Sequence, residues 1–446
     1  MPLTRRLADW CFAFRLEDSP DDVRFAARRA MLDTLGVMAA GQVHPLVRRL
    51  AKGLPGMEGP CSVLCRGRGD AEIAALVNGT AAHVWDFDDT SYTGIMHGSA
   101  VVFPVVLALA EERGLEEEEL TAAFIVGSEI TYTLADICTH RHYFRGWWST
   151  ATFGLIGATA AAARLLGLSA DQMAHAIGFA AAAAGGGKAV FGTDGKPFLV
   201  GETARRAIGL ARASGLGLTG PIGAFEDRHG FFTLLNEGAA TLSEADTLGR
   251  RWRLIEPGLL FKTSPVCSAA HAAIELMARL VSDANISADE IVSIKAEVPE
   301  LVKISLVYPR PGTIQQAQFS LPYSLACAAL HGCVRLADLA QVEIFAADKS
   351  VLMDKVTTVV ADDLSMDEMR ARWPESARLS LALVDGREVE GFCGEAYGMP
   401  KRPLTNEDLA KKISECFNFA GLPIQDCLGL KVSLHQLAAE IFREHS

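Results

Sequence analysis

Apolar positions in the first 266 residues recur with the period of an α-helix almost throughout. Long runs rich in alanine and leucine, such as residues 151–184, are interrupted by glycine and by serine or aspartate. Near residue 168, Gly167 is placed to end one helix and Ser169 to cap the next, with Asp171 in its first turn. Small residues allow helices to approach closely, so this region predicts a compact helical bundle.

The pattern changes after residue 266. Residues 291–300 and 378–392 alternate between polar and apolar positions, as strands do, and Asp385-Gly386 is typical of a hairpin turn. Two stretches between them, 319–332 and 350–363, have the period of helices. This mixture predicts a smaller α+β domain.

Helical character returns near the end of the chain, where Thr405 is a candidate N-cap with Asp408 at the third helical position. The predicted fold class is therefore mostly α: a large all-helical domain, a helical bundle, with an inserted smaller α+β domain. We assign residues 1–266 and 399–446 to the large domain and residues 267–398 to the smaller one.

Composition and charge restrict the partners. Half of the 446 residues are hydrophobic, and the formal net charge is −12, which argues against a nucleic-acid-binding surface. The most apolar stretches, 101–110 and 176–187, are too short to span a membrane, and the first residues lack the apolar core of a secretory signal. We therefore expect a cytoplasmic protein with no nucleic-acid or membrane partner. The large apolar content also favours a homodimer.

Ionisable side chains gather in one short segment, "DFDDTSYTGIMHGSA", residues 86–100. The preceding helical pattern places Asp86 and Asp89 one turn apart near a helix C-terminus, where the helix dipole disfavours acids, so they need solvent or a cationic partner. His97 stands just before the next helix, for which Ser99 is a plausible N-cap. A histidine there can bind a carboxylate or exchange a proton.

Basic residues occur at glycine-rich or turn positions elsewhere: Arg145, Lys196, Lys262 and His271. Each alone is typical of a surface charge, but in an acidic chain they together indicate a positive pocket for a small anionic substrate. No set of cysteine, histidine and carboxylate residues has convincing ligand spacing. We therefore expect neither a metal nor another cofactor.

Seven segments together resemble the MmgE/PrpD family, in family order and spacing: "DTLGVMAAG", "ALVNGTAAHVWDFDDT", "HGSAVVFPVVLALAE", "LLGLSADQMAHAIGFA", "GKPFLVGETAR", "FKTSPVCSAAHAAIE" and "QAQFSLPYSLACAALHG". The resemblance implies a large helical domain and a smaller α+β domain, with the active site in the cleft between them. Carried over by motif position, the site includes Asp86, Thr90, His97, Lys196, Lys262 and Tyr323.

Departures from the family pattern bear on the chemistry. Dehydratase and decarboxylase members usually carry a histidine after the Arg-Gly-aromatic step, where this chain has Trp148 and Ser149. Leu199 and Cys267 stand where some decarboxylase-like members have further histidines. The general acid needed to expel hydroxide or to protonate a decarboxylated carbanion is then missing, whereas a simpler proton exchange remains possible.

This comparison favours an isomerase: a cofactor-independent epimerase that acts on a small, iminodisuccinate-like polycarboxylate. It would remove the α-proton and return it from the other face, with His97 and either Lys262 or Tyr323 as the two bases. Positive groups would stabilise the carbanion. The residues expected to bind the substrate are Asp86, Thr90, Arg145, Lys196 and Trp148.

Two alternatives remain. The first is a lyase of the 2-methylcitrate dehydratase type, in which another group replaces the lost histidine. The second is a non-catalytic protein that binds carboxylates. Loss of water, release of carbon dioxide or inversion of a stereocentre would distinguish the three.

Overall fold

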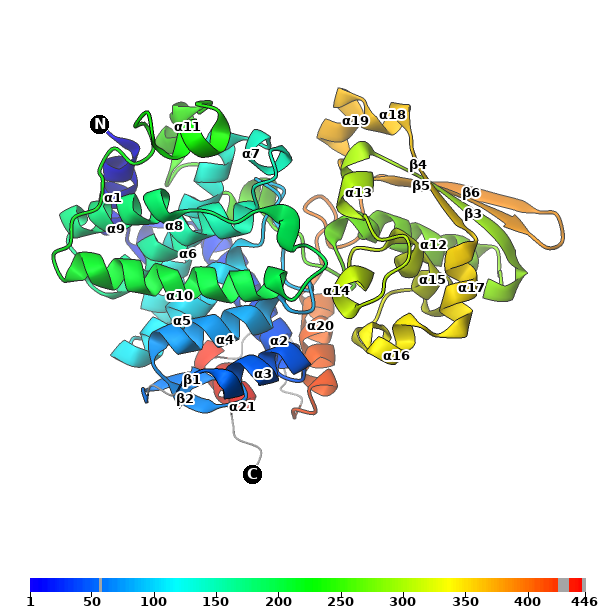
Figure 1. The fold of residues 1–446 in the computed structure, drawn as a ribbon, viewed down its shortest axis with the longest axis horizontal. Helices are drawn as coiled ribbons and strands as arrows, with labels where there is room; N and C mark the ends of the chain where they lie inside the picture. Colours follow the sequence, from blue (N-terminus) through cyan, green and yellow to red (C-terminus); the bar gives the residue numbers. More distant parts are fainter. Residues whose placement is uncertain (56–57, 424–432, 443–446) are drawn as a thin grey trace.

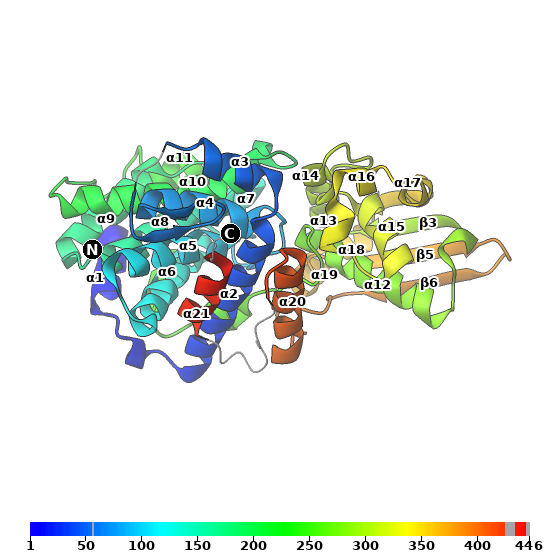
Figure 2. The same ribbon diagram turned by 90° about the horizontal axis from the view of Figure 1, so that it is seen from below.

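The computed structural model describes residues 1–55, 58–423 and 433–442. It is mostly helical and has two parts that lie side by side, as both ribbon views show (Figures 1 and 2). We call the described residues up to 266 and from 399 the helical part, and residues 267–398 the small part. The helical part contains α1 (Leu3–Ala13), α2 (Asp21–Gly41), α3 (Pro45–Gly53), α4 (Ala71–His83), α5 (Gly98–Arg113), α6 (Glu117–Cys138), α7 (Arg141–Phe144), α8 (Ser149–Leu165), α9 (Ala170–Ala183), α10 (Gly195–Gly215), α11 (Phe231–Asn236), α20 (Asn406–Phe419) and α21 (Leu434–Phe442).

Helix α8 is central to the helical part and packs against α5, α6, α9 and α10. Every residue from 149 to 163 is buried, which matches its apolar, alanine-rich sequence. The predicted bundle is therefore confirmed. Its second sequence signal is also confirmed, because Ser169 forms a capping box with Gln172 at the start of α9.

The close contact between α4 and α10 positions part of the candidate site. A Cβ atom at Gly79 would lie 3.0 Å from the Cα atom of Gly201, and one at Gly201 would collide with the carbonyl oxygen of Leu76. Glycine at both positions lets the two backbones approach. This contact brings Lys196, in the first turn of α10, next to the segment that follows α4.

Replacing Gly201 by alanine is expected to lower the free energy of unfolding by about 1–3 kcal/mol, because the added methyl group overpacks this contact. Gly209→Ala is the matched control on the same helix, since its Cβ would have its nearest neighbour at 3.9 Å. The control should stabilise the helix by up to about 1 kcal/mol. Denaturant unfolding followed by circular dichroism measures both, and equal effects would contradict the close approach.

The small part contains a four-stranded sheet in the order β4-β3-β5-β6. Strands β3 and β4 are parallel, with Ile294 opposite Val356, whereas β5 and β6 form the predicted hairpin around Gly386, which has a positive φ of 84°. Helix α12 lies against β5 and β6, and α15 packs on α12. The elements are α12 (His271–Asp283), β3 (Ile291–Val298), α13 (Glu300–Ser305), α14 (Ile314–Ala317), α15 (Leu321–His331), α16 (Gln341–Ile344), α17 (Ala347–Asp354), β4 (Val356–Val360), α18 (Asp362–Ser365), α19 (Asp367–Arg372), β5 (Ala377–Leu383) and β6 (Glu388–Cys393).

Three details of the predicted fold are wrong. The helix expected over 350–363 ends at Asp354 and is followed by β4, whose valine and threonine residues favour a strand. Helix α4 ends at His83, so Asp86, with φ of +49°, and Asp89 lie in the following turn rather than on the helix. The helical part also contains a short hairpin, β1 (Cys61–Val63) and β2 (Gly67–Gly69), so it is not purely helical.

Helix α20 packs on the helical part. Lys412 forms an ion pair with Asp33 of α2 at 2.7 Å and donates a hydrogen bond to the carbonyl oxygen of Phe87. Thr405 accepts a hydrogen bond from the amide of Asp408, as expected for the predicted N-cap. The division after residues 266 and 398 remains a prediction, and these contacts are compatible with it.

Among the described helices, only α6 is long and apolar enough to span a membrane by length and composition. Of its most apolar stretch, 89% is buried inside the protein, which is typical of a core helix in a soluble protein. Cytoplasmic location stays a prediction.

Candidate active site

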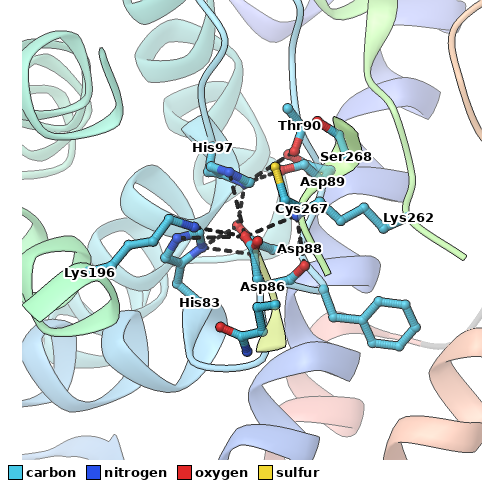
Figure 3. Close-up of polar contacts among 12 residues, drawn as sticks. His83, Asp86, Asp88, Asp89, Thr90, His97, Lys196, Lys262, Cys267 and Ser268 are labelled. Carbon is cyan, nitrogen blue, oxygen red and sulfur yellow. Dashed lines mark hydrogen bonds and ion pairs between the residues drawn. The ribbon is translucent and has the colours of Figure 1, made fainter. Parts of the chain in front are cut away.

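Asp86 is the centre of the charged cluster in Figure 3, and two lysines from distant segments meet it. Its Oδ1 atom accepts hydrogen bonds from the Nζ atoms of Lys196 at 2.8 Å and Lys262 at 3.0 Å. Lys262 also donates to the carbonyl oxygen of Asp86 at 2.7 Å. Burial would raise the pKa of Asp86, but the two lysines outweigh it and hold the pKa well below its usual value.

A short backbone pairing places Lys262 beside this turn. The amide of Thr90 donates to the carbonyl of Leu260 at 2.9 Å, and the reverse bond measures 2.8 Å. Burial alone would lower the pKa of Lys262, but Asp86 and Asp88 outweigh it and raise the pKa above its usual value. Lys262 is therefore an ammonium ion, which contradicts its expected role as a base.

Asp88 binds two histidines. It lies 2.9 Å from His83 Nδ1 and 3.1 Å from His97 Nδ1. His97 Nδ1 also lies 3.0 Å from the carbonyl oxygen of Asp89, so two obligate acceptors assign the proton of His97 to Nδ1. Nε2 of His97 then carries a lone pair, and it lies 3.8 Å from Asp86 Oδ1.

Both histidines are held neutral. Burial lowers the pKa of His83 to about 4, although Asp88 opposes this shift. Burial also lowers the pKa of His97; Asp88 opposes the shift and Lys262 adds to it. A neutral His97 with a free Nε2 can accept a proton.

Asp89 differs from its neighbours because its carboxyl faces no cation at bonding distance. Both oxygens are buried, and the neighbouring Ser99 hydroxyl is a polar group that lowers the pKa of Asp89. Burial raises its pKa well above the usual value, and the nearby Asp33 adds to the shift. Asp89 is therefore a neutral carboxylic acid.

A cavity of about 30 Å³ adjoins the cluster and lies between the two parts of the molecule. Known ligand sites enclose about 300–1,000 Å³, so this cavity has room for little more than a water molecule. The cavity is lined by Asp86, Thr90, Ile95, His97, Tyr143, Trp148, Phe191, Lys196, Lys262, Cys267, Ser268, Ser305, Phe319 and Glu375.

Aromatic rings surround Lys196 at this cavity. Its Nζ lies 5.7 Å from the ring centroid of Trp148, 5.4 Å from Phe191 and 5.0 Å from Phe319. Trp148 also lies beside His83, with ring centroids 5.7 Å apart. These rings keep water away from the ammonium group and strengthen its attraction to an anion.

Six of the eight residues expected in the site line the cavity: Asp86, Thr90, His97, Trp148, Lys196 and Lys262. The other two lie elsewhere. Tyr323 is fully buried in the small part, where its hydroxyl donates to the carbonyl of Asp338. Arg145 forms an ion pair with Glu237. Neither position fits the expected contact with substrate.

The sequence interpretation missed several residues of the site. His83 and Asp88 have a local signal, since both lie within three residues of Asp86, and the acidic motif itself contains Asp88. Glu375 has none, because only the folding of the small part brings residue 375 to the cavity.

One set of side chains has the geometry of a metal site: ligand atoms of His83, Asp86, Asp88 and His97 lie within 4.8 Å of one another. The two lysines argue against a bound metal ion. Lys196 and Lys262 already neutralise Asp86, and they would repel a further positive charge. The expectation that no metal is needed stays a prediction.

The fold and the site define a mostly helical protein with a small cavity between its two parts, lined by Asp86, His97, Lys196 and Lys262. Residues 5–244 match the MmgE/PrpD N-terminal domain and residues 264–421 the MmgE/PrpD C-terminal domain. The chain belongs to the MmgE/PrpD family. This confirms the family resemblance, although the C-terminal match extends past residue 398 and includes α20.

Several relatives match nearly the whole chain. Cis-aconitate decarboxylase of Homo sapiens is 26% identical over 425 residues, which cover 92% of this chain and 86% of that protein. The Mus musculus enzyme is 26% identical over 431 residues with the same coverage. A cis-aconitate decarboxylase-like protein of Aspergillus oryzae is 25% identical over 453 residues, covering 92% and 89%. These relatives are named as decarboxylases, which favours the lyase alternative over the epimerase.

Proposed function

We propose that this protein is a lyase that acts on a small polycarboxylate, with decarboxylation of a cis-aconitate-like acid as the first candidate reaction and dehydration of a 2-methylcitrate-like acid as the second. The observation that carries the proposal is the small cavity in which Asp86 holds two lysines beside a neutral His97. The relatives' names support the choice of a lyase.

The chemistry follows from these charges. Lys196 and Lys262 attract substrate carboxylates and stabilise a carbanion that forms next to them. The free Nε2 of His97 can take up a proton or, once protonated, return it. An anionic substrate would raise the pKa of His97, because it opposes the effect of the lysines.

Epimerisation of an iminodisuccinate-like acid is a candidate function of a different class, since it would make the protein an isomerase and not a lyase. It is favoured by Trp148, which occupies the cavity where the resemblance leads us to expect a proton-transferring histidine. An indole ring cannot exchange a proton with substrate, so Trp148 restricts the reactions that the site can catalyse.

The test is to incubate the purified protein separately with cis-aconitate, 2-methylcitrate and iminodisuccinate. Carbon dioxide release, formation of the unsaturated acid and inversion are followed by NMR spectroscopy. We expect product from one of the first two acids. Inversion of iminodisuccinate alone would replace the lyase by the epimerase, and binding without turnover would indicate a carboxylate-binding protein.

The pH profile gives a further prediction. Since burial lowers the pKa of His97 from 6.5, its basic form persists in the free protein below pH 6.5. For a dehydration, in which a base removes a proton, we therefore expect the acid limb of log(kcat/KM) to lie below pH 6.5, with activity kept at pH 6.5 and lost on further acidification. A profile measured from pH 4 to 8 checks this, and an acid limb above pH 7 would show that the base is another group.

A further inference from the structure

The small part contributes one carboxyl group to the cavity. Glu375 lies in the segment before β5, is only 3% exposed, and shares the cavity lining with His97 and Lys262. Its Oε1 atom is 2.7 Å from Ser268 Oγ, and its Oε2 atom is 3.0 Å from the Tyr92 hydroxyl. A further negative charge would repel a polycarboxylate, so its presence here calls for a chemical reason.

Burial favours the protonated form of Glu375, whereas the groups that face it favour the carboxylate. Burial raises the pKa of Glu375, and the hydroxyl groups of Ser268 and Tyr92 and the charge of Lys262 offset only part of that shift. Burial also raises the pKa of Tyr143, and it raises that of Cys267 to about 12, so these neighbours stay neutral.

Elimination leaves two groups for proton transfer among the described side chains of the cavity. Asp86 is held as an anion by its two lysines and carries no proton to give. The ammonium group of Lys262 is a poor donor near pH 7 because Asp86 and Asp88 raise its pKa above the usual value, and the ammonium group of Lys196 is bound to Asp86 at 2.8 Å. Neutral Tyr143 and Cys267 are poor proton donors near pH 7 because their pKa values are raised. His97 is suited to be the base, which leaves Glu375 as the acid.

Glu375 also has a connection to solvent. A second, larger cavity of about 660 Å³ is lined by Tyr92, Ile95 and Pro374, the neighbour of Glu375. Ile95 lines both cavities, and the larger one reaches the surface at the exposed residue Lys401. The Tyr92 hydroxyl therefore links Glu375 to a space that water can enter.

We propose that Glu375 is the general acid of this site and that Tyr92 returns its proton from the larger cavity. This inference rests on the proposed lyase function and adds the identity of the proton donor. A general acid must regain its proton in each cycle, and the geometry supplies both a buried donor and a route for return.

In a decarboxylation, the bond to the departing carboxylate breaks and leaves its electron pair on the substrate as a carbanion. The Glu375 O–H bond then breaks, its proton forms the new C–H bond, and its electron pair stays on the Glu375 carboxylate. In a dehydration, His97 Nε2 removes the proton from the carbon next to the carboxylate, the C–H electron pair forms the new double bond, and the C–O bond breaks as the Glu375 proton joins the departing hydroxyl to form water. Afterwards a proton from water reaches Glu375 through the Tyr92 hydroxyl, which gives up its own proton and receives the new one in a single concerted transfer, because burial and Glu375 raise the pKa of Tyr92 and disfavour its anion.

Glu375→Gln tests the proposal in the full-length protein with the acid that the wild type turns over. We expect kcat to fall at least a hundredfold, with KM changed less than fivefold. The wild-type kcat should decrease on the basic side as Glu375 loses its proton, and the variant's residual rate should lack this limb. Glu256→Gln is the matched control, because Glu256 lines only the larger cavity, and it should leave kcat and its pH profile unchanged.

Tyr92→Phe provides a second test that does not depend on the folding of the first variant. Tyr92 donates a hydrogen bond that lowers the pKa of Glu375, so its removal should move the basic limb of kcat to higher pH. A wild-type rate and profile in Glu375→Gln, or an unmoved limb in Tyr92→Phe, would overturn the inference and leave the lyase function standing. No turnover by the wild type would overturn both.

Discussion

Replacement of His97 by alanine is expected to lower the kcat of a dehydration by about a hundredfold to ten-thousandfold, with a smaller effect on KM, because a base must remove the α-proton in that reaction. The reason is geometric: Nδ1 of His97 is committed to Asp88 and the Asp89 carbonyl, which leaves Nε2 as a base beside the two lysines. Alanine removes the base but keeps the lysines that attract the anion. A decarboxylation forms its carbanion by loss of carbon dioxide and needs no base, so the variant should keep more of that activity. Steady-state kinetics with the substrate identified by NMR spectroscopy measures both constants.

Added imidazole should restore part of the lost rate of His97→Ala, because it can enter the vacated volume and accept the proton. His229→Ala is the control, since His229 is exposed and lies outside the cavity. If His97→Ala keeps its fold and dehydrates its substrate at the wild-type rate, the role of His97 carried over from the family motifs is wrong.

Much of the helical part could be predicted because its signals are local. Ser169 and Thr405 cap their helices through the adjacent turn, and the alanine-rich pattern of α8 reports burial on all sides. Strand β4 was missed because its pairing is not local. Its residues form ladder hydrogen bonds only once β3, more than fifty residues earlier, lies beside them.

The candidate site likewise contains residues that a local sequence pattern identifies and residues that only the fold brings together. The segment 86–97 could be identified because its acids and His97 lie within one short stretch. The protonation state of Lys262 could not be predicted, because it depends on an ion pair with Asp86, 176 residues away. Tyr323 was misplaced because a buried hydroxyl takes the nearest free acceptor, here the carbonyl of Asp338. Glu375 depends entirely on the packing of the small part against the helical part.

Asp86→Asn is expected to lower the free energy of unfolding by about 3–5 kcal/mol, because it leaves the buried ammonium groups of Lys196 and Lys262 without their shared negative charge. Denaturant unfolding at pH 7 measures the loss. Asp89→Asn is the matched control three residues along the same turn. Since Asp89 is neutral and lacks a cationic partner at bonding distance, its change to asparagine should shift the free energy of unfolding by less than about 1 kcal/mol.

A double substitution separates the lost charge from any general disturbance of the turn. Lys262→Met removes one of the two ammonium groups that Asp86→Asn leaves unpaired, so the double variant should lose less stability than the sum of the two single variants. The difference should be about 1–3 kcal/mol, since Lys262 is fully buried and lies 3.0 Å from Asp86. Additive losses would mean that Asp86 does not hold Lys262 by charge, and the electrostatic account of how this site attracts a polycarboxylate would fail with it.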